Sequence, residues 1–239
     1  IRWAGDAHPV AIAFWRVAIA AVVWSPAPLL GTKIGRRKPT KQQKHLAVLA
    51  GLFLCFHFAT WTSSLSFTTV SSAVFLILIQ PILIALAAHL FIHEHLNRWN
   101  VLAMMLTVAG ALLICGNDLQ LGTGYLIGDG LALLGAFGST AYLYVARLAR
   151  PDRQGVEGMQ LVSYLPIVYR TAAIGLLVIC IALRVPLFGF GARTWMSLLA
   201  LGLVPTVFGH SLFNWAMRYL PAFSAVSYTH LTLPTNREV

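Results

Sequence analysis

The chain has 239 residues, of which 58% are hydrophobic and 10% are charged, and its mean hydropathy is +0.76. Soluble domains carry about 25% charged residues, so this composition excludes an ordinary soluble protein and indicates a membrane protein. The net charge of +10 could suggest nucleic-acid binding, but six of the seventeen basic residues lie in one short loop between apolar segments, namely Lys33, Arg36, Arg37, Lys38, Lys41 and Lys44. A basic cluster beside an apolar segment is typical of membrane topology, so we expect no nucleic-acid partner.

Seven apolar segments are long enough to cross a bilayer as helices. They cover residues 10–30, 46–66, 70–92, 100–116, 125–147, 161–183 and 195–217. The sequence therefore predicts an all-α fold, a polytopic transmembrane helical bundle of about seven spans.

The basic residues divide unequally between the two ends of these predicted spans. One end would hold eleven of them: Lys33, Arg36, Arg37, Lys38, Lys41, Lys44, Arg98, Arg147, Arg150, Arg153 and Arg218. The other end would hold three: Arg2, Arg184 and Arg193. Because loops rich in Lys and Arg stay in the cytoplasm, the sequence predicts a cytoplasmic loop at 33–44 and an external residue 1.

The second half of the chain resembles the first. Residues 49–74 align with residues 201–226 at a constant offset of 152, and residues 14–18 align with residues 168–172 at an offset of 154. Five helices per repeat would place equivalent helices in opposite orientations, as in the inverted repeats of secondary transporters. We predict a first repeat at 1–120 and a second at 121–226, with chance similarity between apolar helices as the alternative.

Both ends of the chain depart from this pattern. Residues 1–9 contain neither an initiator Met nor a signal peptide, so we expect the natural N-terminus to be missing. The repeat predicts a further span after Ala222, but residues 227–239 are polar and too short to cross a bilayer. We expect that the second repeat is truncated or that this tail is not native.

The segment from 70 to 92 contains no Asp, Glu, Lys or Arg, and Pro81 lies near its middle. A proline there removes a backbone hydrogen bond and kinks or breaks the helix, which neighbouring groups must compensate. Gln80 could bond the carbonyl freed by the proline or contact a solute. Glu94 closes the segment at its cytoplasmic edge, where we expect it to pair with basic residues.

These features resemble the EamA-like transporter family of the drug/metabolite transporter superfamily. The resemblance rests on FWRVAIAAVVW (14–24), on SSLSFTTVSSAVFLILIQPILIALAAHLFIHEHL (63–96) with its small residues, proline and glutamate, and on VLAMMLTVAGALLICG (101–116) with Gly110 and Gly116. It covers roughly residues 8–226. The resemblance implies ten helices in two inverted repeats, of which this chain would hold helices two to eight and a stub of the ninth. It also implies a permease for amino acids, other metabolites or drugs.

Four side chains are candidates for a solute-binding cavity near the middle of the membrane. His57 and Trp61 are four residues apart and share one helix face, and His210 and Asn214 have the same spacing on the repeat-related helix. Polar and aromatic side chains inside a membrane are expected to point inward, where they can line a cavity. Hydrogen bonding between helices is the alternative.

Two arginines, Arg16 and Arg170, lie inside predicted spans. A membrane-buried arginine is costly and needs a partner, which could be an anionic or zwitterionic solute. Snorkelling or capping of exposed carbonyl groups is the alternative. We assign Arg170 to solute binding with Gln80, and we assign Arg16, which lies close to the start of its span, to a structural or gating role with Pro81 and Glu94.

One helix carries a stripe of small residues, Gly128, Ala132, Ala136 and Thr140, which predicts close helix packing. Tyr142 and Tyr144 on that helix are weaker site candidates. No enzymatic motif is complete, because the zinc-protease pattern begun at His93 and Glu94 would require a histidine at Asn97. Cys55, Cys115 and Cys180 are isolated, so we expect no metal and no cofactor.

We therefore expect an integral membrane permease that moves a small metabolite or drug-like molecule, such as an amino acid, by alternating access. We expect a multi-pass protein of the cell membrane, in bacteria the inner membrane, and a homodimer is compatible with this expectation. A structural scaffold protein and a membrane-embedded enzyme are the alternatives.

Overall fold

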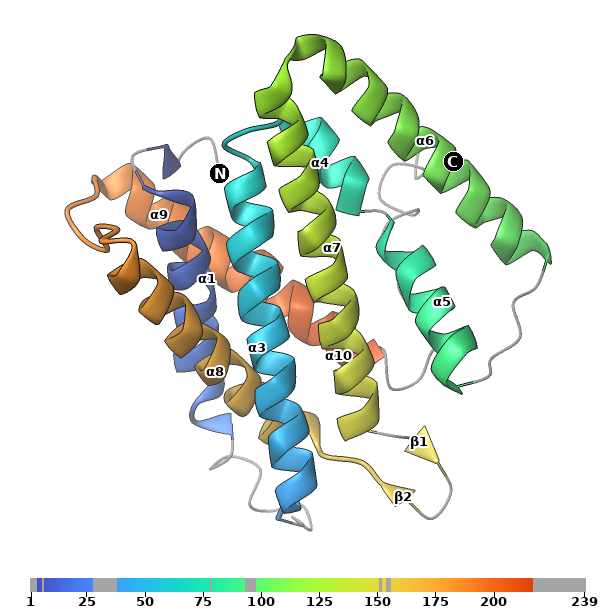
Figure 1. Ribbon diagram of the computed structural model, residues 1–239. Helices are drawn as coiled ribbons and strands as arrows, with labels where there is room; N and C mark the ends of the chain where they lie inside the picture. Colours follow the sequence, from blue (N-terminus) through green and yellow to red (C-terminus); the bar gives the residue numbers. More distant parts are fainter. Residues whose placement is uncertain are drawn as a thin grey trace, which may run out of the picture.

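A computed structural model describes residues 4–5, 7–27, 38–77, 79–92, 98–150, 152–153 and 156–216 (Figure 1). The helices are α1 (Pro9–Trp24), α3 (Lys41–Ser64), α4 (Val70–Ile77), α5 (Gln80–Ile92), α6 (Arg98–Leu121), α7 (Thr123–Ala149), α8 (Leu161–Ala182), α9 (Ala192–Leu201) and α10 (Ser211–Ala216), with a π-helix, η3 (Gly202–His210), between the last two. The strands β1 (Asp152–Arg153) and β2 (Val156–Glu157) form a short antiparallel ribbon before α8. The predicted all-α bundle is confirmed.

Four helical segments of the described chain are long and apolar enough to cross a membrane. They are Lys41–Ser64, Gly124–Ala149, Leu161–Ala182 and Ala192–Trp215, the last of which combines α9, η3 and most of α10. Shorter apolar helices lie at Pro9–Trp24 and over Val70–Ile84. Within the described residues, each predicted apolar segment thus contains a helix, although the number of spans in a bilayer stays a prediction.

The first long helix begins where its sequence supplies a capping box. The Thr40 hydroxyl accepts a hydrogen bond from the backbone N–H of Gln43 at 3.2 Å, and the Gln43 side chain accepts one from the backbone N–H of Thr40 at 3.0 Å. These two bonds satisfy N–H groups that a helix start leaves without partners. Lys41 and Lys44 therefore lie in the first turn of α3, whose start is set by these two bonds.

The segment 70–92, for which a kink or break at Pro81 was predicted, consists of two helices. α4 ends at Ile77, and α5 starts at Gln80 with Pro81 as its second residue. A proline in the first turn of a helix costs no hydrogen bond, because the N–H group there has no partner within the helix. The break therefore lies just before the proline rather than at it.

The predicted link after residue 116 is also shorter than expected. α6 continues to Leu121, and only Gly122 separates it from α7, which folds back sharply (Figure 1). Gly122 has a φ of 127°, a conformation that residues with a side chain rarely adopt. Glycine therefore permits this abrupt reversal.

The bundle is organised around α3, which packs against α7 on one side and against α1 and α8 on the other (Figure 1). In the predicted small-residue stripe on α7, Ala132 and Ala136 are fully buried, and Ala132 packs with Ala73 and Leu76 of α4. A Cβ atom at Gly128 would lie only 2.6 Å from Thr68, and one at Gly135 would lie 2.9 Å from Trp61. Glycines on α7 therefore allow close contact with α3 and with the residues that follow it.

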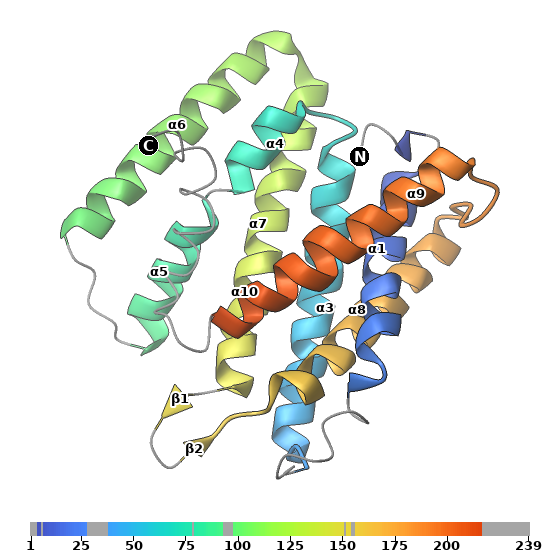
Figure 2. The same cartoon turned by 180° about the vertical axis from the view of Figure 1, so that it is seen from behind.

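Helices that are equivalent under the sequence offsets run in opposite directions. α1 runs antiparallel to α8, and α3 runs opposite to the rod formed by α9, η3 and α10, which crosses behind it (Figures 1 and 2). The offset of 152 maps residues 41–64 onto 193–216, nearly the full length of that rod. This arrangement agrees with an inverted repeat, while the boundaries 1–120 and 121–226 stay a prediction.

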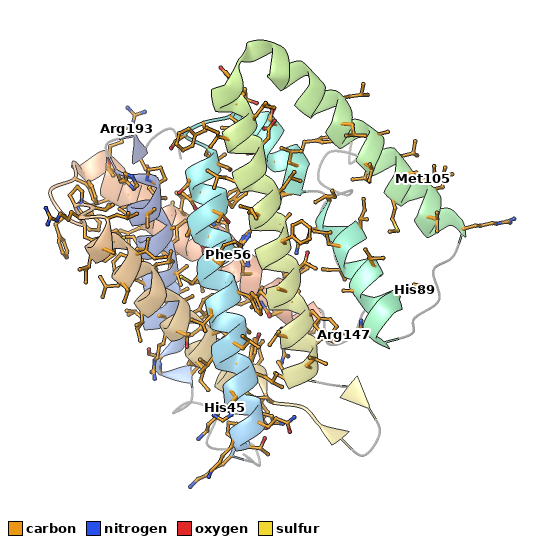
Figure 3. All side chains as sticks on the ribbon, in the orientation of Figure 1. His45, Phe56, His89, Met105, Arg147 and Arg193 are labelled. Carbon is orange, nitrogen blue, oxygen red and sulfur yellow. The ribbon has the colours of Figure 1, made fainter. Side chains whose placement is uncertain are left out.

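The two ends of the bundle differ in character. His45 lies at one end and Arg193 at the other (Figure 3), and we call them the basic end and the far end. At the far end Trp15, Phe188, Phe190 and Trp195 pack edge to face or tilted, with 4.9 Å between the ring centroids of Trp15 and Trp195. The Trp15 indole N–H also donates a hydrogen bond to the Leu187 carbonyl at 2.9 Å. Such aromatic groups are typical of membrane–water interfaces.

Candidate functional site

A buried arginine lies where α1, α3 and η3 meet. Arg16 on α1 is only 4% exposed, and its Cζ atom lies 4.8 Å from the ring centroid of Phe58 and 5.7 Å from that of Trp61. Its Nε–H donates a hydrogen bond to the Thr206 hydroxyl of η3 at 3.4 Å. No carboxylate pairs with this guanidinium within the described residues.

Close backbone approach makes this arrangement possible. A Cβ atom at Gly202 would lie 2.7 Å from Ile19, so glycine allows η3 to pack tightly on α1. In η3 the Thr206 hydroxyl also donates to the carbonyl of Leu201, five residues earlier, at 2.8 Å. π-Helical turns are rare and are often found at functional sites.

Aromatic rings from α3 and η3 surround the arginine. The ring centroids of His57 and His210 are 6.3 Å apart, those of Phe58 and His210 are 5.3 Å apart, and His57 stacks on Trp61 at 6.2 Å. Phe58 and His210 are also exact equivalents under the offset of 152. We call Arg16, His57, Phe58, Trp61, Thr206 and His210 the central cluster.

The backbone of α7 fixes the position of His57. The His57 Nδ1 atom lies 2.8 Å from the Gly135 carbonyl oxygen, and the ring is only 4% exposed. Because a carbonyl oxygen can only accept, Nδ1 carries the proton and Nε2 is left as an acceptor in the neutral ring. The absence of a side chain at Gly135 allows α3 to come this close.

Asn214 forms the side of the site that faces the basic end. Its side-chain N–H group donates to the Tyr142 hydroxyl and, at 2.7 Å, to the His210 carbonyl. The carbonyl can only accept, so the Asn214 amide turns its nitrogen towards His210 and its oxygen away from it. The Asn214 Oδ1 atom is buried and has no hydrogen-bond partner among the described residues. An unsatisfied acceptor therefore lies next to the central cluster.

Arg150 holds the basic end of the bundle together. It donates through Nη1 to the Asn214 carbonyl at 2.8 Å and through Nε to the Met159 carbonyl at 3.2 Å. Its guanidinium also lies 5.6 Å from the ring centroid of Tyr164. These contacts join the end of α7, the residues before α8, and α10.

At the far end the bundle is hollowed by a cavity of about 730 Å³. Its lining includes His8, Ile12, Thr62, Val70 and Pro186. Ile12 precedes Arg16 by four residues, and Thr62 follows Phe58 by four residues, so each lies one helical turn, about 6 Å, from the contact between Arg16 and Phe58. The cavity therefore lies about one helical turn from the central cluster.

The structure places the predicted site residues in three groups. His57, Trp61 and His210 meet in the central cluster, and Asn214 lies beside them. Arg170 does not join them, because its side chain is exposed and donates to the Ser25 hydroxyl at 3.3 Å. Gln80 is buried, but no hydrogen bond or ring contact joins it to this cluster within the described chain. Glu94 lies outside the described residues, as does the tail at 227–239, and of Pro81 only the helix position is described.

The sequence alone placed Arg16 in a structural or gating role and singled out neither Phe58 nor Thr206. Arg16 lies early in its helix, which favoured a structural role, yet η3 covers that part of α1 and buries the guanidinium. The alignment contained a usable signal, because the offset of 152 pairs Phe58 with His210. Thr206 carried no such signal.

No group of three or more His, Cys, Asp or Glu side chains that could hold a metal ion occurs within the described ranges. Cys55 and Cys180 are buried free thiols. Asp129 on α7 is buried and accepts a hydrogen bond from the Thr68 hydroxyl at 2.8 Å. What the central cluster offers is therefore hydrogen bonding, positive charge and aromatic surface.

Comparison with known proteins agrees with this architecture. No curated protein matches the sequence. One crystal structure of a protein superposes on the chain with a TM-score of 0.69 and 18% sequence identity, covering 96% of this chain and 78% of the other, which shows the fold alone. Residues 2–116 match the EamA-like transporter family. This match covers just under half of the chain, and over these residues the sequence is similar to a family of membrane transporters.

Proposed function

We propose that this protein is a transporter that moves a small metabolite, such as an amino acid or a related solute, across the cytoplasmic membrane by alternating access, and that the solute binds at the central cluster. One observation carries the proposal. Polar and aromatic side chains from both sequence-related halves, His57 and Trp61 on α3 and His210 on η3, meet one turn below the cavity at the far end. Transporters built from inverted repeats place their sites at such an interface.

The two ends of the bundle support alternating access. The far end is open to a cavity, whereas Arg150 links α7, α10 and the residues before α8 at the basic end. If the basic end is cytoplasmic, this arrangement corresponds to a state that is open to the outside. Movement of one repeat against the other would then break the Arg150 contacts and close the cavity.

The free hydrogen-bonding capacity of the site favours a solute with polar groups. The Asn214 Oδ1 atom could accept from an N–H or O–H group of a solute, and the Trp61 ring could stack on apolar parts of it or contact an amine through its face. A solute with an amino group, such as an amino acid, could donate to Asn214 Oδ1 and also contact the face of the Trp61 ring. Gln80, Arg170 and Glu94 have no assigned contact with the solute in this proposal.

The described structure offers no feature that favours a scaffold protein or a membrane-embedded enzyme over a transporter. A scaffold protein has no need of a cavity that lies about one helical turn from a buried arginine. A membrane-embedded enzyme would need an acid–base pair or a metal cluster. The six residues of the central cluster include no carboxylate and no thiol.

Uptake by the protein reconstituted in phosphatidylcholine liposomes tests the proposal. Radiolabelled amino acids, organic acids, sugars and nucleosides are supplied outside the liposomes, and empty liposomes serve as the control. The proposal predicts saturable uptake of at least one class. Correctly folded protein that takes up none of them above the control would contradict it.

A further inference from the structure

We propose that Arg16 is the recognition site for a carboxylate group of the solute, held by the guanidinium of Arg16 together with the indole N–H of Trp61. This inference rests on the proposed function and adds the chemical class of the solute. Its basis is an excess of hydrogen-bond donors over acceptors around a buried positive charge.

The guanidinium of Arg16 is far from satisfied by the protein. It carries five N–H donors, and the one hydrogen bond it makes to the described residues uses Nε, with Thr206, at 3.4 Å. The remaining four N–H donors, on the two terminal nitrogens, have no acceptor among those residues. The Phe58 and Trp61 rings lie 4.8 and 5.7 Å from Cζ, but aromatic faces compensate only part of the loss of hydration.

A second donor beside Arg16 also lacks an acceptor. The Trp61 Nε1 atom is buried and has no hydrogen-bond partner among the described side chains and backbone. Trp61 can only donate through this atom, so the group that completes it must be an acceptor. The same ring lies against Arg16, and therefore both requirements apply in one place.

Geometry favours a carboxylate over other acceptors. The planar guanidinium presents paired N–H groups that match the two oxygens of a carboxylate in a bidentate contact. A protein carboxylate does not occupy this position in the described structure, and the cavity at the far end lies about one helical turn from it. A purely structural arginine would instead be expected to bond backbone carbonyls or a fixed carboxylate.

The related arginine supplies a matched control. Arg170 corresponds to Arg16 under the offset of 154, but it is exposed and bonds Ser25 away from the central cluster. Removal of either arginine lowers the net charge by one. Only removal of Arg16 should affect a carboxylate that binds in the cluster.

Phenylacetate and its neutral amide, phenylacetamide, are suitable probes because they share an aromatic ring and differ in the carboxylate. Each probe is added to the purified protein in detergent micelles, and the midpoint of thermal unfolding is measured. At about ten times its dissociation constant, phenylacetate should raise the midpoint by roughly 3 °C or more over phenylacetamide, because it binds only the folded state. Arg16→Gln should abolish this difference, and Arg170→Gln should retain it.

Two further variants decide the result if Arg16→Gln does not fold. Arg16→Lys keeps the charge but loses the bidentate geometry, and Trp61→Phe keeps a ring but loses the N–H donor, so both should reduce the phenylacetate shift. A shift that is absent from the original protein, or equal in the original protein and these variants, would overturn the inference. Liposome uptake separates this failure from that of the proposed function. If the protein takes up a solute but phenylacetate does not raise the unfolding midpoint, only the carboxylate site is contradicted. If phenylacetate raises the midpoint but no solute is taken up, only transport is contradicted.

Discussion

At the scale of single residues, the absence of side chains is as important to the site as their presence. Gly135 allows His57 to reach the backbone of α7, and a Cβ atom at Gly138 would lie 3.0 Å from the His57 backbone nitrogen. Gly202 plays the same part for Arg16 on the other side of the central cluster. The positions of the polar groups therefore depend on close helix contacts.

Replacement of Gly135 by alanine tests this dependence. The new Cβ atom would lie 2.9 Å from the Trp61 Cβ atom, so α3 and α7 must separate, and we expect a loss of about 1–3 kcal/mol of stability. Gly130 on the same helix has no atom within 4 Å of its ideal Cβ position, so Gly130→Ala should stabilise α7 by up to about 1 kcal/mol. Thermal unfolding of both variants in detergent measures the difference, and equal effects would show that the close contact is unimportant.

The residue scale also shows what the sequence could and could not predict about the site. The spacing of four residues predicted that His57 and Trp61 share a helix face, and that His210 and Asn214 do likewise, because this follows directly from helix geometry. The burial of Arg16 and the exposure of Arg170 could not be found in this way. Both depend on which helix covers which face, and that is a property of the packed bundle rather than of either segment.

At the scale of elements, the main feature is the interruption of two helices. The structure breaks the segment 70–92 between Ile77 and Gln80 and widens residues 202–210 into a π-helix. The position of Pro81 in the apolar segment predicted that a span would be interrupted there, but it did not predict that the break would lie before the proline. Proline is compatible with the first turn of a new helix, so the chain ends α4 before it.

The break before α5 provides the next prediction. Pro81→Ala restores a backbone N–H group and removes the restriction on the preceding residue, which allows α4 and α5 to join into one helix. If the break lets one repeat move against the other, the variant should fold normally but transport more slowly. Pro26→Ala, at the exposed end of α1, is the control and should transport at the original rate. Unchanged transport by a normally expressed Pro81→Ala variant would exclude Pro81 from the mechanism.

At the scale of the whole molecule, charge and aromatic residues distinguish the two ends. Lys41 and Lys44 begin α3 at the basic end, whereas Arg193 lies at the far end beside the aromatic group of Trp15 and Trp195. The uneven count of basic residues predicted this separation from the sequence. In the proposed mechanism, an inverted repeat would let the cavity at the far end and the Arg150 contacts at the basic end exchange, because an odd number of helices per repeat places equivalent helices in opposite directions.

Cysteine labelling tests the orientation. In a variant without native cysteines, a membrane-impermeant maleimide should react from opposite sides with single cysteines placed at Lys38 and at Gln120, and Arg193→Cys should behave like the latter. The basic end should be labelled only when the reagent has access to the cytoplasmic face. Reaction of Lys38→Cys and Gln120→Cys from the same side would contradict the predicted topology.

Solute affinity of a double variant tests the central claim most directly. Trp61→Ala combined with Asn214→Ala removes an aromatic surface from α3 and polar groups from α10, so the apparent affinity for the transported solute should fall by at least about tenfold. A control double variant, Phe137→Ala with Met105→Ala, alters side chains that are 56% and 66% exposed on the outside of the bundle and should keep the original affinity. Concentration-dependent uptake into liposomes gives both values. A folded Trp61→Ala, Asn214→Ala variant with the original affinity would contradict a solute site at the central cluster.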